Sequence, residues 1–168
     1  MRRWLAPLFL LLSVLMPLGA QSARQPDDYV VLCYHDIVDL KLTPNLKLYP
    51  QTIRRDTLIR HFNWIKQQGY HPVSFQQVLD AKAGKAALPE KAILLSFDDG
   101  YESFYRLVYP LLKLYNYPAV YALVGSWLDV PDDKLVPYGN DRLPRSYFVG
   151  WPQIREMQAS GLVEIASH

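Results

Sequence analysis

Short, mostly apolar runs alternate with amphipathic segments along this chain, and that alternation constrains the fold more than any other feature. The runs occupy residues 29–34, 92–95, 119–124 and 163–166, with a brief one at 72–73. Runs of this length suit strands that are covered on both faces, as the strands of parallel sheets are. Because helix-period segments separate them, the sequence predicts an α/β fold of β–α–β units with a parallel sheet.

The segments between the runs predict helices with definable ends. Gly69 is placed to end the first helix, and Ser74 is the expected N-cap of the second. A third helix is expected over residues 102–115 with a bend or break near Pro110, and a last one over residues 151–160. The expected inner faces are Leu58, Phe62 and Ile65 in the first helix and Phe75, Val78 and Leu79 in the second.

The charge balance argues against nucleic-acid binding through a basic surface. The chain carries 18 basic and 16 acidic residues, a formal net charge of +2, without a run of like charges. The single cysteine, Cys33, excludes a disulfide within this chain and a cysteine-rich zinc site. A metal ion would therefore be bound by histidine and carboxylate groups, and Cys33 is expected to be unpaired and buried.

Residues 1–23 have the features of a signal peptide. Arg2 and Arg3 form a positive start, an apolar stretch interrupted by Pro17 follows, and small and polar residues end the segment. The stretch is shorter than the ~20 residues of a membrane span, and an uncleaved N-terminal anchor is the alternative. No cysteine lies at the exit, so lipid attachment is not expected. The sequence predicts export to the periplasm, which leaves residues 24–168 with equal numbers of basic and acidic residues.

Polar residues suited to chemistry follow three predicted strands: His35 with Asp36, Asp98 with Asp99, and His168. The carboxyl ends of parallel strands surround a common site in α/β folds. Adjacent carboxylates there are unfavourable unless a cation or hydrogen bonds compensate their charge, so this pair indicates a metal site. The alternative is a plain turn with a helix N-cap. Asp36 is likewise either an orienting residue or part of a turn.

Two segments resemble motifs of a known family. Residues 94–101, Leu-Leu-Ser-Phe-Asp-Asp-Gly-Tyr, resemble the first motif of the polysaccharide deacetylases (carbohydrate esterase family 4, the NodB-homology family). Residues 163–168 resemble the start of the second motif. The resemblance implies that Asp99 and His168 bind one divalent metal ion (zinc, nickel, cobalt or iron), with a further histidine ligand beyond His168, and that Asp98 is the general base.

A third segment narrows the resemblance to one branch of that family. Residues 33–37, Cys-Tyr-His-Asp-Ile, are similar to a histidine motif that most members carry late and this branch carries early, as a circular permutation. The branch removes N-acetyl groups from poly-β-1,6-N-acetyl-D-glucosamine, a biofilm exopolysaccharide. The resemblance implies that His35 is the general acid of a metal-dependent hydrolase, with the N-acetylglucosamine polymer and the exopolysaccharide export machinery as partners.

The resemblance also implies a fold, the distorted (β/α) barrel of the polysaccharide deacetylase type. Residues 24–168 would be the N-terminal portion of that domain, because the predicted strands are fewer than a complete barrel needs. The barrel is therefore expected to be incomplete in this chain. An isolated stretch of this kind is expected to have an incomplete metal site and little activity.

Most aromatic residues are expected in the core. The candidates for lining a sugar groove are Tyr101, Tyr138, Tyr147 and Trp151, which follow the Asp–Asp–Gly turn or flank residues 129–149. That proline-containing segment is expected to be a long surface loop. His61 and His71 are expected to be structural or exposed.

Other functions remain open on the sequence. The nearest is a deacetylase of peptidoglycan or chitin oligomers, which the linkage of the substrate would distinguish. A polysaccharide-binding module with the same fold and weak activity is a second possibility, and an unrelated α/β metallohydrolase is a third.

Overall fold

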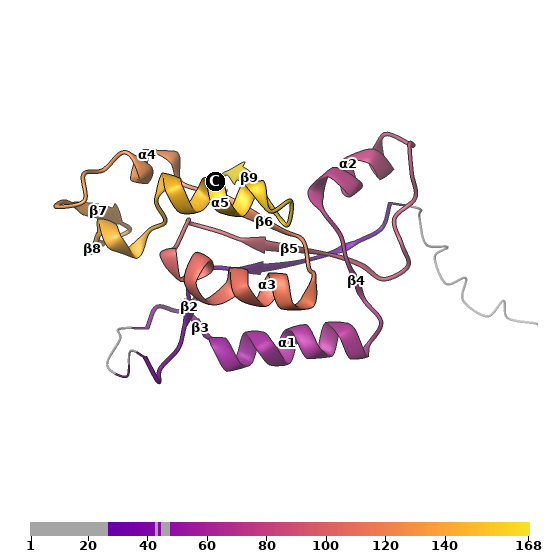
Figure 1. Cartoon of the computed structure of the whole chain (residues 1–168), viewed down its shortest axis with the longest axis horizontal. Helices are drawn as coiled ribbons and strands as arrows, with labels where there is room; N and C mark the ends of the chain where they lie inside the picture. Colours follow the sequence, from indigo (N-terminus) through magenta and orange to yellow (C-terminus); the bar gives the residue numbers. More distant parts are fainter. Residues whose placement is uncertain (1–26, 43, 45–47) are drawn as a thin grey trace, which may run out of the picture.

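The computed structural model describes residues 27–42, 44 and 48–168, so the predicted signal peptide at 1–23 lies outside the described residues. A parallel sheet forms the centre, with strand order β1-β5-β6-β9 and a short strand, β4, also paired to β5. The strands are β1 (Val30–Tyr34), β4 (His71–Pro72), β5 (Ala92–Phe97), β6 (Ala119–Leu123) and β9 (Val163–Ser167). The predicted parallel α/β sheet is confirmed (Figure 1).

The strand register brings the carboxyl ends of β1, β5, β6 and β9 to one edge of the sheet. The last pairs are Tyr34 with Phe97, Phe97 with Tyr121, and Leu123 with Ser167. Tyr34 and Phe97 are buried in the main core. Because side chains alternate between the two faces of a strand, Cys33 and its partner Ser96 point to the opposite face. The residues after β1, β5 and β9 therefore start from neighbouring positions.

The structure describes five α-helices, of which four contribute side chains to the main core. The helices are α1 (Arg55–Gln67), α2 (Phe75–Lys82), α3 (Tyr109–Tyr115), α4 (Gly125–Leu128) and α5 (Trp151–Ala159). Side chains of α1, α3 and α5 and Leu128 of α4 join the sheet in one buried cluster, and Figure 1 shows α1, α3 and α5 running beside the strands. The predicted inner face of α1 is confirmed, because Leu58, Phe62 and Ile65 are fully buried.

The predicted inner face of α2 is only partly correct. Ser74 caps the helix as predicted, and Val78 is buried in a small cluster separate from the main core. Phe75 and Leu79, however, are each 43% exposed. The Glu164 carboxylate accepts hydrogen bonds from the first backbone N–H groups of α2, which holds the helix by its N-terminus against β9. In that orientation only one apolar residue of the expected face reaches a core.

The irregularity predicted near Pro110 takes the form of a π-helical turn, η1 (Phe104–Val108), that runs directly into α3. The Tyr109 N–H donates to the carbonyl of Phe104, five residues earlier. A wider turn of this kind accommodates a residue that, like Pro110, has no backbone N–H to donate.

The prediction of an irregular surface loop at residues 129–149 is wrong. The segment contains an antiparallel hairpin of β7 (Leu135–Tyr138) and β8 (Asp141–Pro144), followed by a 3₁₀ turn, η2 (Arg145–Tyr147). Gly139 adopts a φ of +56° at the hairpin turn, a conformation that suits glycine. The prolines made the hairpin hard to predict from the sequence. Proline is tolerated there because each strand of a two-stranded ribbon has a free edge, where no backbone N–H is needed for pairing.

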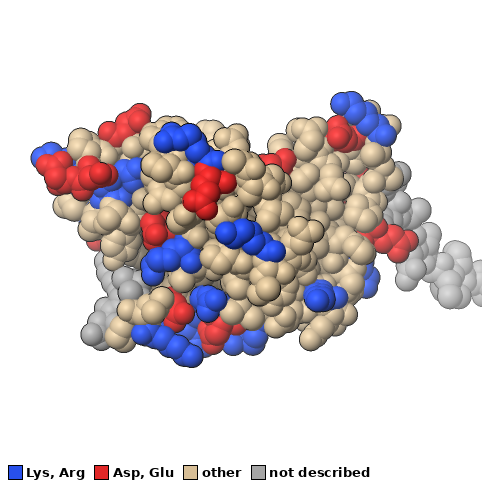
Figure 2. Space-filling model, in the orientation of Figure 1, with Lys and Arg blue, Asp and Glu red and all other residues tan. Residues whose placement is uncertain are grey.

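A second short parallel pair, β2 (Ile37–Val38) with β3 (Ile53–Arg54), links the end of β1 to the start of α1. On the face seen in Figure 2, acidic and basic side chains are intermixed rather than gathered by sign. Among the described residues, helices are all too short or too polar to cross a membrane.

Candidate active site

Asp98, the first residue after β5, is held by hydrogen bonds from two strands. Its backbone N–H donates to the carbonyl of Tyr34 at 2.9 Å. Its carboxylate accepts from the Ser96 hydroxyl at 2.9 Å on one oxygen and from the Cys33 thiol at 3.2 Å on the other. The carboxylate is thus oriented by side chains from both β1 and β5.

Asp99 and Gly100 form a turn in the left-handed region of the backbone, with φ of +72° and +79°. A Cβ on Gly100 would lie 3.1 Å from Cδ2 of Leu123, so glycine also allows a close approach to β6. Aspartate in this conformation carries some backbone strain, and strain of this kind is concentrated at functional sites. The turn directs the Asp99 side chain away from β5 and toward the end of β9.

Asp99 meets His168 at that position. The His168 Nε2 atom lies 3.3 Å from Oδ1 of Asp99, and the exposed fractions of the two side chains are 43% and 12%. The backbone N–H of His168 donates to the carbonyl of Leu123 at 2.9 Å, which continues the pairing of β9 with β6. The fold therefore fixes the backbone from which the imidazole reaches Asp99.

The surroundings of Asp99 leave its negative charge poorly solvated. Burial, the largest cause, raises the pKa of its carboxyl group, and the neighbouring Asp98 raises it further. His35 and His168 act in the opposite direction and lower the pKa. Because the site holds two carboxylates and little water can reach Asp99, an additional cation beside it would be stabilising.

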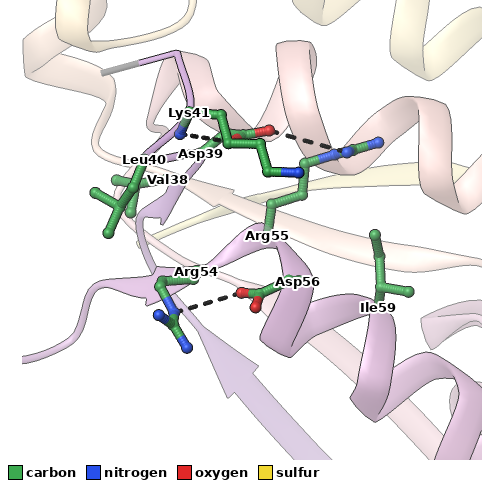
Figure 3. Close-up of a pocket in the computed structure, with 8 residues that line it drawn as sticks. All are labelled: Val38, Asp39, Leu40, Lys41, Arg54, Arg55, Asp56 and Ile59. Carbon is green, nitrogen blue, oxygen red and sulfur yellow. Dashed lines mark hydrogen bonds and ion pairs between the residues drawn. The ribbon is translucent and has the colours of Figure 1, made fainter. Parts of the chain in front are cut away.

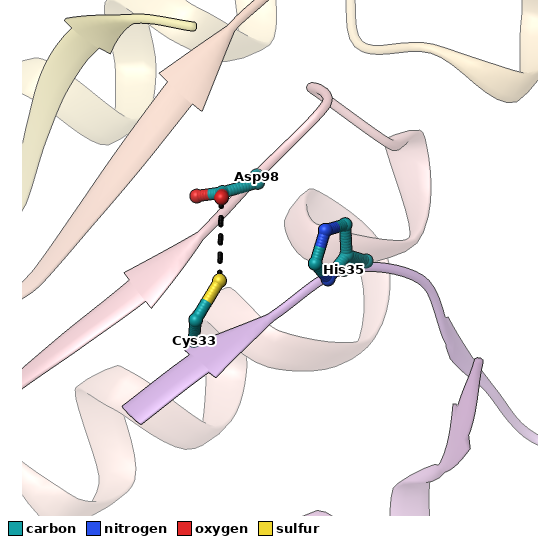
Figure 4. A group of neighbouring side chains, drawn as sticks. All are labelled: Cys33, His35 and Asp98. Carbon is teal, nitrogen blue, oxygen red and sulfur yellow. Dashed lines mark hydrogen bonds between the residues drawn. The ribbon is translucent and has the colours of Figure 1, made fainter. Parts of the chain in front are cut away.

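A second group combines Cys33, His35 and Asp98, whose potential ligand atoms all lie within 4.8 Å of one another (Figure 4). Burial raises the pKa of the Cys33 thiol to about 11, and the hydrogen bond to Asp98 contributes in the same direction. The thiol is therefore protonated near neutral pH, whereas metal ions bind the thiolate. A metal ion that bound the sulfur would therefore have to displace its proton.

The structure thus brings together His35, Asp98, Asp99 and His168, four of the five polar residues that the sequence placed at strand ends, and the fifth, Asp36, is buried. Their individual roles remain predictions. Sequence reasoning missed the Cys33 contact, because Cys33 was expected to be buried and is instead exposed. The sequence spacing could have indicated this contact, because Cys33 lies two residues before His35 on β1, the strand that pairs with β5.

The predicted sugar-binding aromatics differ in exposure. Tyr101 is 3% exposed and stacks on Phe148 at a centroid distance of 5.5 Å, so its ring supports the hairpin rather than lining an open groove. Tyr138 and Tyr147 are partly buried members of the same cluster. Trp151, at the start of α5, is 49% exposed and lines a hollow of about 620 Å³ together with Phe148.

Two further hollows border α1. One of about 410 Å³ lies between β2 and α1, and its walls are tied by the ion pairs Arg54–Asp56 and Arg55–Asp39 (Figure 3). An apolar hollow of about 440 Å³ lies beside β1 and α1, where Nδ1 of His61 lies 3.1 Å from the Tyr34 hydroxyl. That contact agrees with a structural role for His61.

Two carboxylates and two histidines at the carboxyl edge of a parallel sheet are typical of the reaction sites of α/β enzymes. More particularly, the chain belongs to the polysaccharide deacetylase family, whose model, described as "Polysaccharide deacetylase", matches residues 85–168. The matched part contains Asp98, Asp99 and His168 but begins after His35.

Relatives cover most of the chain. The chain is 42% identical over 149 residues to the poly-β-1,6-N-acetyl-D-glucosamine N-deacetylase of Escherichia coli K12. That match covers 87% of this chain and 22% of the relative. Among solved structures, a de-N-acetylase from Aggregatibacter actinomycetemcomitans is 57% identical with a TM-score of 0.76. The BpsB deacetylase domain from Bordetella bronchiseptica is 42% identical with a TM-score of 0.69. Both matches cover 83% of this chain and 54% of the solved chain.

The chain therefore spans about a fifth of the length of the curated relative and about half of the solved structures. The fold of these neighbours supports the interpretation of the sheet as part of a deacetylase barrel.

Proposed function

We propose that this chain is the N-terminal portion, residues 24–168, of a metal-dependent deacetylase that removes N-acetyl groups from poly-β-1,6-N-acetyl-D-glucosamine. The observation that carries the proposal is the convergence of His35 and Asp98 with Asp99 and His168 at one edge of the sheet. Membership of the polysaccharide deacetylase family supports the reaction, and the names of the relatives support the substrate.

The donor set of Asp99 and His168 fits a divalent metal ion. A carboxylate oxygen and an imidazole nitrogen lie 3.3 Å apart, close enough to bind one ion between them, and zinc, nickel, cobalt and iron all accept such ligands. A metal ion held there would supply Lewis acidity, which polarises the acetyl carbonyl and lowers the pKa of a water molecule.

Asp98 and His35 would then carry the protons. Asp98 accepts a proton from the attacking water, while the thiol of Cys33 and the hydroxyl of Ser96 keep its carboxylate oriented. His35 donates a proton to the glucosamine nitrogen as the C–N bond breaks, so acetate and a free amine leave. Amide hydrolysis needs this acid because an unprotonated amine leaves poorly.

We also propose that the protein is exported and acts in the periplasm together with the export machinery of the exopolysaccharide. The support is the predicted signal peptide at 1–23 and the polymer named for the relative from Escherichia coli.

The test uses the chain extended to the length of its solved relatives. Free-amine release is measured from β-1,6-linked and β-1,4-linked N-acetylglucosamine oligomers, with and without a chelator. We expect release from the β-1,6 oligomers that the chelator abolishes and an added divalent metal restores. Faster release from the β-1,4 oligomers would instead indicate a chitin-type or peptidoglycan-type deacetylase, and binding without release would indicate a binding module.

A further inference from the structure

Asp36, the residue after His35, is buried although it carries a carboxylate. It is 8% exposed, and Ser103, its hydrogen-bond partner, is also 8% exposed. The Ser103 hydroxyl donates to Oδ1 of Asp36 at 2.7 Å. In the described part of the chain the buried polar residues are these two and Arg145, so the pair is an unusual feature of this core.

The pair joins two segments that are distant in sequence, 67 residues apart. Ser103 precedes the π-helical turn η1 and follows the Asp98–Gly100 turn by three residues. Besides donating to Asp36, its hydroxyl oxygen accepts a hydrogen bond from the backbone N–H of Ile37 at 3.3 Å. One serine side chain thus contacts both residues that follow His35.

His35 is consequently tied on both sides to the segment that carries the paired aspartates. On its N-terminal side, the carbonyl of Tyr34 accepts from the N–H of Asp98 at 2.9 Å. On its C-terminal side, the connection to that segment is the contact of Asp36 and Ile37 with Ser103. Between these ties, the side chains of His35 and Asp98 approach each other.

A turn alone would not need this arrangement. Burying a carboxylate is unfavourable unless hydrogen bonds replace its hydration, and an exposed aspartate could stabilise a turn without that cost. The Asp36 carboxylate instead accepts a hydrogen bond from Ser103, and Thr52, the backbone of Ile37 and the positive charge of Arg106 act to lower its pKa against the larger effect of burial, which raises it. The Asp36 carbonyl also accepts from the N–H of Ile53 at 3.0 Å, which anchors the residue to β3.

We propose that Asp36 and Ser103 are a pair of positioning residues that fix His35 against Asp98, so that acid and base stay at the separation the reaction requires. The inference rests on the proposed function, since His35 is taken as the general acid there. Both residues are buried, so their effect on the reaction is expected to pass through His35. Misplacing a catalytic group by about 1 Å can reduce turnover by about a hundredfold, so the loss of a single buried contact can lower turnover measurably.

The test is a double-mutant cycle between Ser103 and His35 in the chain extended to the length of its relatives. Ser103→Ala is expected to lower kcat about tenfold to a hundredfold, with KM and bound metal unchanged. In the His35→Ala background the same substitution should change the residual kcat less than about twofold, because the group that Ser103 positions is absent. Ser103→Thr, which keeps the hydroxyl, should retain most of the activity.

Controls separate positioning from folding and from the reaction itself. Ser126→Ala removes a hydroxyl from an exposed serine in α4 and should leave kcat and thermal unfolding unchanged. Asp36→Asn tests the pair from the other side and should lower kcat as Ser103→Ala does. Equal loss from Ser103→Ala in both backgrounds, or no loss in either, would overturn the inference. Absence of deacetylation in the unsubstituted protein would instead overturn the proposed function.

Discussion

Asp98 and Asp99 are neighbours in sequence with different surroundings, and we expect their substitutions to have different effects. Asp98→Asn should retain bound metal and lose about 10²- to 10⁴-fold in turnover, because it removes the proton acceptor beside Cys33 and Ser96. Asp99→Ala should lose metal as well, because it removes the carboxylate that faces His168. Metal content by elemental analysis, measured beside kcat, distinguishes them. Equal metal content and activity in the two variants would contradict the assignment.

Cys33 allows a prediction about pH. The residue is exposed, yet partial burial of its thiol and the contact with Asp98 raise the pKa from 9.0 to about 11, which leaves about a hundredfold less thiolate near neutral pH than in an ordinary cysteine. Alkylation by iodoacetamide at pH 8 should therefore be about a hundredfold slower in the folded chain than in the same chain in denaturant. The alkylation rate in the folded chain should rise as the pH is raised, because the fraction of thiolate rises. Mass spectrometry measures both rates, and equal rates at pH 8 would contradict the raised pKa.

At the scale of elements, the β7–β8 hairpin supports the turn that carries the paired aspartates. Leu143 is 7% exposed and belongs to the cluster of Tyr101 and Phe148. Leu143→Ala should lower the free energy of unfolding by about 2–3 kcal/mol, because it leaves a cavity in that cluster. Leu135→Ala, in the same hairpin at a residue that is 50% exposed, is the matched control and should change it by less than about 0.5 kcal/mol. Urea unfolding measures both, and equal effects would show that the cluster contributes little.

The elements that could be predicted from the sequence are those whose side chains follow one period. The apolar run of β5 and the spacing of Leu58, Phe62 and Ile65 in α1 predicted the strand and the helix face that the structure has. The orientation of α2 depends on Glu164, a residue 88 positions from Gln76, and local periodicity contains no such information. The Asp36–Ser103 contact also joins residues far apart in sequence, 67 positions, so the residues of the site could be predicted while the contacts that orient them could not.

At the scale of the molecule, the sheet is open at both sides in the part of the chain that the structure describes. β1 and β9 are the outer strands of the order β1-β5-β6-β9. Val30 and Val31 of β1 are 49% and 48% exposed, although strands of parallel sheets are ordinarily covered. The solved relatives are about twice as long as this chain's matched part, which covers 54% of each of them. We expect the additional chain to cover this edge.

The same reasoning predicts that residues 24–168 bind metal weakly. Catalytic metal sites in proteins commonly use three protein ligands, and Asp99 with His168 supplies two. We expect residues 24–168 to bind a divalent metal at least about tenfold more weakly than the chain extended to the length of its relatives, and to release little free amine. Calorimetric titration with zinc and an amine-release assay on both chains measure the difference. Stoichiometric binding with full turnover by residues 24–168 would mean that the acid, the base and two metal ligands at this sheet edge are sufficient.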